Sequence, residues 1–81
     1  MNRPRIANKL YLQTLSYTVK PDQDVIIKNY IDGYEKEILY EGKLYTNVTS
    51  KERDILDNLF YKQVYGVNVE DNKLIILIDN R

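Results

Sequence analysis

Apolar residues recur with the period of an α-helix in one segment in the second half of the chain. Over residues 50–62 one face of the implied helix is charged, and the other carries Ile55, Leu56, Leu59 and Phe60. Thr49 and Glu52 have the spacing of a capping box, in which each side chain bonds the backbone amide of the other. The pattern therefore predicts a helix over residues 50–62, with Thr49 or Ser50 as its N-cap.

The segment after this helix alternates with the period of a β-strand, and Asp71-Asn72 divides it as a two-residue hairpin loop would. The predicted pairs are Glu70–Lys73, Val69–Leu74, Val67–Ile76 and Tyr65–Ile78 on one face, with Asn68–Ile75 and Gly66–Leu77 on the other. The last strand is apolar on both faces, which is typical of a central strand or of an interface. Ile75 and Leu77 have no apolar partner within this hairpin, so we expect them to need other cover.

An earlier hairpin is predicted around Asp32-Gly33, because both loop positions of a type I′ turn need positive φ angles. The matched register pairs Ile31–Tyr34, Ile27–Ile38, Val25–Tyr40, Tyr30–Glu35, Lys28–Glu37 and Ile26–Leu39. It places Tyr34 on the apolar face, as a core residue, and Tyr30 on the charged face, as a contact residue.

Two further strands complete the expected sheet. Glu41-Gly42 reads as a second turn leading into a short strand over residues 43–48. The segment 9–20 fits either a helical stripe or a strand, and its Thr and Tyr content with Pro21 at its end favours the strand. The predicted fold is α+β, a mostly antiparallel sheet with a single helix packed on it, in the order β-β-β-β-α-β-β.

The composition indicates one small domain. The chain has 81 residues and no cysteine, so its core must come from Leu, Ile, Val and Tyr, without disulfides. We take residues 1–81 as a single domain and expect residues 1–8 to form a flexible basic arm.

The charge balance excludes two classes of function. Twelve basic residues face twelve acidic ones, whereas a general nucleic-acid coat and an acidic DNA mimic both need a field of one sign.

The longest apolar run, residues 74–78, is too short to span a membrane, and the N-terminal sequence lacks the apolar core of a secretory signal. We therefore expect a soluble cytoplasmic protein. Its richness in Lys, Asn, Ile and Tyr is typical of AT-rich coding DNA, which many phages and mobile elements have.

The sequence carries no motif of a catalytic, metal or cofactor site. It lacks histidine and cysteine, and its three glycines form no phosphate-binding loop. Asp22 and Asp24 resemble part of a cation site but more simply form a turn, and Glu35 and Glu37 are best interpreted as a solvated strand face. Asn47 matches a glycosylation acceptor, but Thr49 is explained by its role as a helix cap. We expect no enzyme activity and no cofactor.

Eight tyrosines suggest contact surfaces, since tyrosine is enriched at protein interfaces. Tyr17, Tyr40 and Tyr65 are expected to point inward. The candidate protein contacts are Tyr30, Tyr45, Tyr61, Ile75 and Leu77. A basic cluster near the N-terminus could hold phosphates beside a stacking ring, and these candidate nucleic-acid contacts are Arg3, Arg5, Lys9 and Tyr11.

The function that best fits these features is a small binding or accessory protein that acts through protein–protein contacts, including self-association to a homodimer. A regulator or inhibitor from a phage or mobile element is its most specific form. The alternative is a nucleic-acid-binding accessory protein that uses the basic arm and the sheet tyrosines. An enzyme built on carboxylates would need an arrangement that the sequence does not show.

Overall fold

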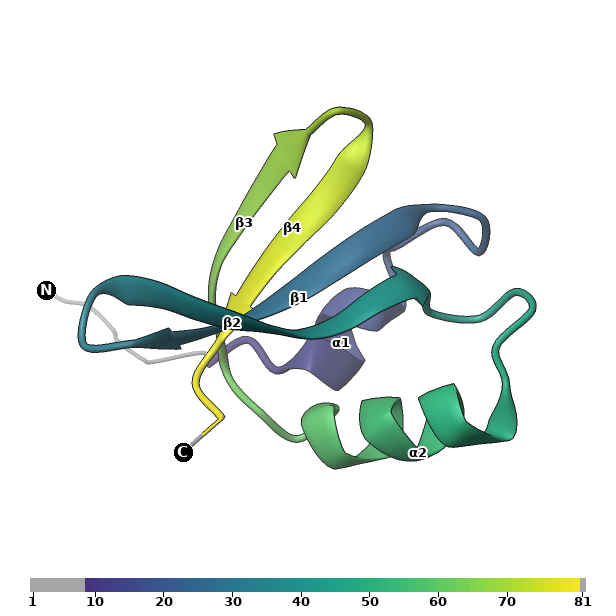
Figure 1. Cartoon of the computed structure of the whole chain (residues 1–81), viewed down its shortest axis with the longest axis horizontal. Coiled ribbons are helices and arrows are strands. Elements are labelled where there is room, and N and C mark those ends of the chain that lie inside the picture. The colour runs from purple at the N-terminus through teal and green to yellow at the C-terminus, as the bar shows by residue number, and fades with distance from the viewer. Residues whose placement is uncertain (1–8, 81) are drawn as a thin grey trace, which may run out of the picture.

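Two β-hairpins lie side by side and form one four-stranded mixed sheet (Figure 1). The computed structural model describes residues 9–80. Along the chain the elements are α1 (Leu12–Ser16), β1 (Asp24–Ile31), β2 (Tyr34–Lys43), α2 (Ser50–Leu59), β3 (Val64–Glu70) and β4 (Lys73–Ile78). The strand order is β2-β1-β4-β3, with antiparallel pairing inside each hairpin and parallel pairing between β1 and β4.

The α+β class is confirmed, but the details of the predicted order are wrong. The described chain has the order α-β-β-α-β-β, with two helices instead of one and a mixed sheet instead of a mostly antiparallel one. β4 occupies a central position, one of the two outcomes that its apolar residues on both faces predicted. No helix in the described residues is long and apolar enough to cross a membrane.

The first predicted strand is wrong, because the segment 9–20 contains the short helix α1. Leu12 anchors this helix. Its side chain is fully buried, and its amide donates to the carbonyl of Lys62 at 3.0 Å. The amide of Val64 donates in turn to Leu10 at 2.7 Å, so the segment docks on the chain that follows α2. Burial of one leucine and these tertiary bonds outweigh the weak strand propensity of Thr and Tyr.

The predicted strand over residues 43–48 is also absent, because β2 continues through Glu41 and Gly42 to Lys43. Gly42 has a φ angle of +149° and pairs with Val25, so it is a strand residue in a conformation that side chains disfavour. The chain after Lys43 forms a loop that contains the buried Leu44.

Near its turn, the first hairpin has the predicted register. Asp32 and Gly33 both have positive φ angles, and Tyr30 pairs with Glu35 and Ile31 with Tyr34. Two bulges then shift the pairing, so the predicted pairs further from the turn are wrong. The observed pairs there are Lys28–Ile38, Ile27–Tyr40, Ile26–Glu41 and Val25–Gly42.

The core role expected for Tyr34 is wrong, whereas Tyr30 keeps part of its ring accessible. Tyr34 is 68% exposed, with the Lys36 ammonium 5.6 Å from the centre of its ring, whereas Tyr30 is half-buried. The turn of the first hairpin extends beyond the helices, which lie under the other end of the strands (Figure 1). Neither α1 nor α2 therefore covers the apolar face of the hairpin at Tyr34.

The second hairpin is confirmed over five predicted pairs, from Glu70–Lys73 to Gly66–Leu77. Asp71 and Asn72 have φ angles of 52° and 63°, as the loop of a type I′ turn requires. The sixth pair is wrong, because Ile78 pairs with Val64 and a bulge removes Tyr65 from the register.

The capping box of α2 is confirmed in both directions. The Glu52 amide donates to Thr49 Oγ1 at 3.1 Å, and the Thr49 amide donates to Glu52 Oε1 at 3.0 Å. The helix ends at Leu59, before the predicted residue 62. Its buried residues join a core that also draws on α1, all four strands and the loop after β2: Leu12, Val25, Ile27, Tyr40, Leu44, Leu56, Leu59, Val64, Ile76 and Ile78.

The cap makes a testable contribution to stability. We expect Thr49→Ala to lower the free energy of unfolding by about 1 kcal/mol, because the Glu52 amide loses the Thr49 hydroxyl oxygen that accepts its hydrogen bond. Urea denaturation measures the change. Ser50→Ala, at the next exposed position, is the matched control and should change stability far less; equal losses would contradict the importance of the cap.

The exposure of Tyr34 gives a second expectation. Tyr34→Ala should change the free energy of unfolding by less than about 0.5 kcal/mol, as exposed positions usually do. Leu56→Ala, which opens a cavity at a fully buried position, should cost about 2–5 kcal/mol in the same urea titration. A large loss of unfolding free energy in Tyr34→Ala would contradict this expectation and support the core role that the sequence predicted for Tyr34.

Candidate functional site

One face of the sheet is covered by neither of the two helices in residues 9–80, and we call it the open face. Both helices contribute to the core on the opposite face, where alternate residues of β1 and β4 meet them. The strand pairings bring together on the open face Ile26, Lys28 and Tyr30 of β1, Lys73, Ile75 and Leu77 of β4, Ile38 and Glu41 of β2, and Asn68 of β3.

The floor of the open face is formed by Ile75 and Leu77, which are only 4% and 7% exposed. The cover that they were expected to need comes from the sheet itself, so these two candidate protein contacts have little accessible surface. The parallel pairing places Ile26 beside Ile75 and Lys28 beside Leu77. Leu77 also leans over Gly66, where an added Cβ would lie 3.3 Å from Leu77 Cδ1. Their own neighbours bury these side chains, so they support the face without being available for contact.

The exposed apolar surface lies on the two edge strands of the sheet. Ile38 on β2 is 52% exposed, and Tyr65 on β3 is 53% exposed. The rings of Tyr30 and Tyr65 lie 6.4 Å apart at an angle of 30°, near the end of the sheet where β1 turns into β2. The two rings, together with Asp32, Gly33 and Asp79, line a shallow hollow of about 200 Å³.

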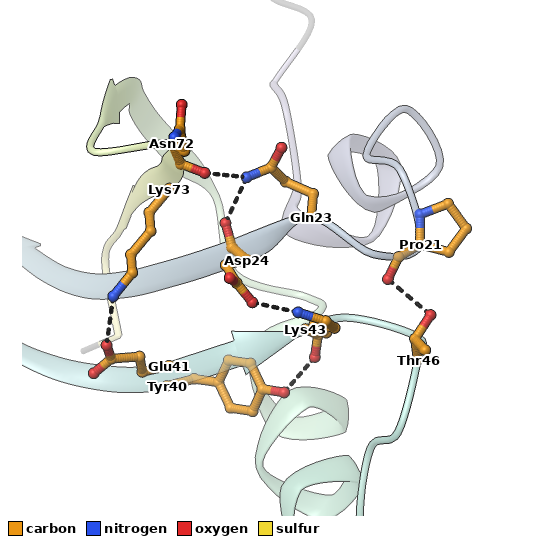
Figure 2. A network of polar contacts seen from close by, with 9 residues as sticks. All are labelled: Pro21, Gln23, Asp24, Tyr40, Glu41, Lys43, Thr46, Asn72 and Lys73. Atoms are coloured by element: carbon orange, nitrogen blue, oxygen red, sulfur yellow. Dashed lines mark hydrogen bonds and ion pairs between the residues drawn. The ribbon is translucent and has the colours of Figure 1, made fainter.

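Two ion pairs lie on the open face between these edge strands. Lys28 Nζ lies 3.1 Å from Glu35 Oε1, and Lys73 Nζ lies 3.4 Å from Glu41 Oε2. The second pair joins β4 to β2 and so spans β1, which lies between them (Figure 2). A third pair, Lys43 Nζ with Asp24 Oδ1 at 2.6 Å, closes the end of the sheet where β1 begins.

A polar network ties this end of the sheet together (Figure 2). Gln23 Nε2 donates to the carbonyl oxygens of Asp24 at 2.9 Å and of Asn72 at 2.8 Å, which links the start of β1 to the turn of the second hairpin. Thr46 Oγ1 donates to the Pro21 carbonyl at 2.9 Å and holds the loop after β2. These bonds fix the relative position of the two hairpins at one end.

Two side chains of the network have shifted pKa values. The hydrogen bond and charge of Lys43 lower the pKa of Asp24 below its ordinary value of 3.8. Burial, and secondarily the charge of Glu52, raise the pKa of Tyr40, whose hydroxyl donates to the Lys43 carbonyl. Both shifts arise from structural contacts, so neither group resembles an acid or base set up for catalysis.

The predicted protein contacts do not form one patch. Only Tyr30 has partly accessible surface on the open face, above the floor formed by Ile75 and Leu77. Tyr45 is 41% exposed, and its hydroxyl donates to the Ser16 carbonyl of α1. Tyr61 is 76% exposed and directly follows α2. These two tyrosines therefore lie with the helices, away from Tyr30.

The predicted nucleic-acid contacts are only partly described. Arg3 and Arg5 lie outside the described residues, as does the predicted arm over residues 1–8. Lys9 is exposed, and Tyr11 is 41% exposed and forms an isolated bridge with Gln63. Tyr11 is thus positioned beside the start of β3.

Three of the four carboxylates considered as cation or acid–base candidates are engaged in other contacts. Asp24 pairs with Lys43 and Glu35 with Lys28, while Glu37 Oε2 accepts from Asn29 at 3.5 Å. Within the described part of the chain, no three acidic side chains come together as metal ligands would.

Tyr65 and Ile38 are the surface residues that sequence reasoning missed. Both were placed inward by a regular alternation, which the bulges of β2 and β3 interrupt. For β3, Gly66 was the feature of the sequence that could have indicated the bulge, since a glycine inside a strand pattern often marks one. Tyr17, also expected to point inward, is 76% exposed, whereas Tyr40 is buried as predicted.

No protein-family model matches the chain, and neither the curated proteins nor the solved structures include a significant match.

The Asp24–Lys43 pair predicts a pH-dependent contribution to stability. Because the folded state lowers the pKa of Asp24, the contribution is present above the ordinary pKa of 3.8 and is lost as the pH falls through the lower folded value. We expect Lys43→Met to raise the pKa of Asp24 toward 3.8 in an NMR titration of the carboxyl group.

The control for this titration is Lys36→Met, which removes a lysine near the turn at the other end of the hairpin. It should leave the pKa of Asp24 unchanged. An Asp24 pKa that stays low in Lys43→Met would contradict the pairing.

Proposed function

We propose that this protein is a small binding protein without catalysis of its own, and that it uses the open face to contact another protein. The observation that carries the proposal is that the open face holds exposed Ile38 and Tyr65 on its two edge strands and the half-buried ring of Tyr30 beside Tyr65. Aromatic side chains are enriched at protein interfaces relative to the rest of the protein surface.

The tyrosines are suited to this role for a physical reason. A tyrosine ring buries a large area at a low cost in conformational entropy, and its hydroxyl bonds at the wet edge of an interface. Tyr30 and Tyr65 also hold one another in place, since their rings pack at 6.4 Å. The surface is therefore partly organised before any partner binds.

A nucleic acid is the second candidate partner, and the same two rings favour it, because stacked tyrosines can receive unpaired bases. The charges of the open face favour a protein instead. Lys28, Lys43 and Lys73 each pair with a carboxylate, so they offer little net attraction to phosphates.

The biological setting of the proposal rests on composition alone. A cytoplasmic regulator or inhibitor encoded by a phage or mobile element fits a short, neutral chain rich in Lys, Asn, Ile and Tyr. In that role the protein would occupy the surface of a larger partner.

The experiment is an affinity capture from a lysate of the organism that encodes the protein, with and without nuclease. We expect a protein partner that survives nuclease and that is lost with the double variant Ile38→Ala and Tyr65→Ala. The loss should correspond to about 30-fold weaker binding or more, since aromatic hot spots cost about 2 kcal/mol or more.

The matched control is Tyr17→Ala with Tyr61→Ala, which removes two tyrosines that are each 76% exposed on the helical side. This control should bind the partner as the wild type does. Loss of the partner in the control alone would move the site to the helices, and loss of all binding with nuclease would favour the nucleic-acid function. Thermal melts of both double variants check that each is folded.

A further inference from the structure

Strand β3 forms one outer edge of the sheet, and its surface is unusually apolar for an edge. It is last in the strand order, with β4 on its inner side. Val67 is 40% exposed and Val69 is 72% exposed. An edge strand presents a row of backbone donors and acceptors, so an apolar edge is suited to pair with another strand.

The hairpin geometry shows which backbone groups of β3 face outward. In a two-residue hairpin the residues that flank the loop bond to each other, so Glu70 directs its amide and carbonyl toward β4. Alternation along the strand then directs the amides and carbonyls of Val69 and Val67 away from the sheet. Val64, before the bulge, also faces outward, and its amide donates to Leu10. Residues 10–11 thus cover only the start of this edge.

The opposite edge, β2, has the protection that β3 lacks. β2 carries Glu35, Lys36, Glu37, Glu41 and Lys43, and its pairing with β1 has two bulges. Lysines, charges and bulges are the usual devices that keep an edge strand from pairing. In contrast, β3 has a single charged residue, Glu70, at its far end, and its one bulge lies at Tyr65, before residues 66–70.

We propose that β3 pairs with β3 of a second copy of this chain, antiparallel, and joins the two sheets into one. The register places Asn68 on the two-fold axis, with Val67 of one copy opposite Val69 of the other. It uses residues 66–70, the part of the edge that Leu10 and Tyr11 leave uncovered. Both outward-facing valines of each copy then exchange backbone hydrogen bonds with their opposite valines.

The side chains are self-complementary in this register. Val67 and Val69 of both copies form a cluster on the helical face, where β-branched residues pair well across strands. Glu70 lies opposite Gly66, which has no side chain to oppose it, and the two Glu70 carboxylates lie at opposite ends of the pair. Parallel pairing would instead set Glu70 beside Glu70. The second copy is therefore antiparallel, and the dimer has the two-fold symmetry most common in proteins.

A groove beside Val67 extends this apolar cluster. Val67 and Leu74 line it together with Leu15 and Val19, which come from α1 and the chain after it. The groove has a volume of about 330 Å³. Pairing through β3 would place the valines of the second copy next to the groove, so the apolar contact is wider than the two strands alone.

Sedimentation velocity over a range of protein concentrations tests the proposal, with purified wild-type chain. We expect a reversible monomer–dimer equilibrium and, by hydrogen exchange, amides of Val67 and Val69 that lose protection on dilution. Val69→Lys should be monomeric throughout, because a lysine on the edge opposes strand pairing. Val69→Thr should still dimerise, since it keeps the β-branched shape and the backbone bonds.

Ile38→Lys is the matched control, because it adds the same charge at a position of comparable exposure on the open face. It should dimerise as the wild type does. A wild-type chain that stays monomeric into the millimolar range would overturn the proposal. A dimer that survives Val69→Lys but is lost in Ile38→Lys would also overturn it and would place self-association on the open face.

Discussion

The parallel pairing of β1 with β4 is the contact on which the rest of the structure depends. Each hairpin forms from residues close in sequence, but a single hairpin is at best marginally stable in water. The pairing of Val25, Ile26 and Ile27 with Leu74, Ile75 and Ile76 joins the hairpins and makes both inner strands central. This parallel pairing creates the apolar face that α1 and α2 cover, and it buries the other side of β4 against neighbouring strands. It also leaves β2 and β3 as the edges of the sheet. The two proposed binding surfaces, the open face and the β3 edge, both follow from it.

Short patterns in the sequence correctly predicted the elements that are stabilised by contacts between residues close in sequence. The capping box of Thr49 and Glu52 and the loop dipeptides Asp32-Gly33 and Asp71-Asn72 each act within a few residues, and the structure has all three. The helix α1 and the continuation of β2 through Gly42 depend instead on distant contacts: Leu12 docks on the chain after α2, and Gly42 pairs with Val25. The bulges change which residues share a face, and a regular alternation cannot reveal them.

The candidate site shows the same difference between what short sequence patterns predict and what distant contacts determine. An apolar pattern on both faces correctly indicated that Ile75 and Leu77 need cover, but it could not identify the source of that cover. The parallel neighbour β1 supplies it through Ile26 and the stem of Lys28, so no second protein is needed at this point. The surface that remains available lies one strand further out, where Ile38 and Tyr65 project after bulges. A pattern can thus show that a strand is central while misplacing the contact surface by one strand.

The two proposed surfaces would act together because of their geometry. A two-fold axis through Asn68 runs perpendicular to the sheet, so the open faces of both copies lie on the same side. Two four-stranded sheets would then present one continuous surface, with a Tyr30–Tyr65 pair in each copy. A partner with two matching sites would bind such a dimer more tightly than a monomer, because the second contact becomes intramolecular. Self-association through β3 would therefore strengthen binding at the open face without adding any contact to it.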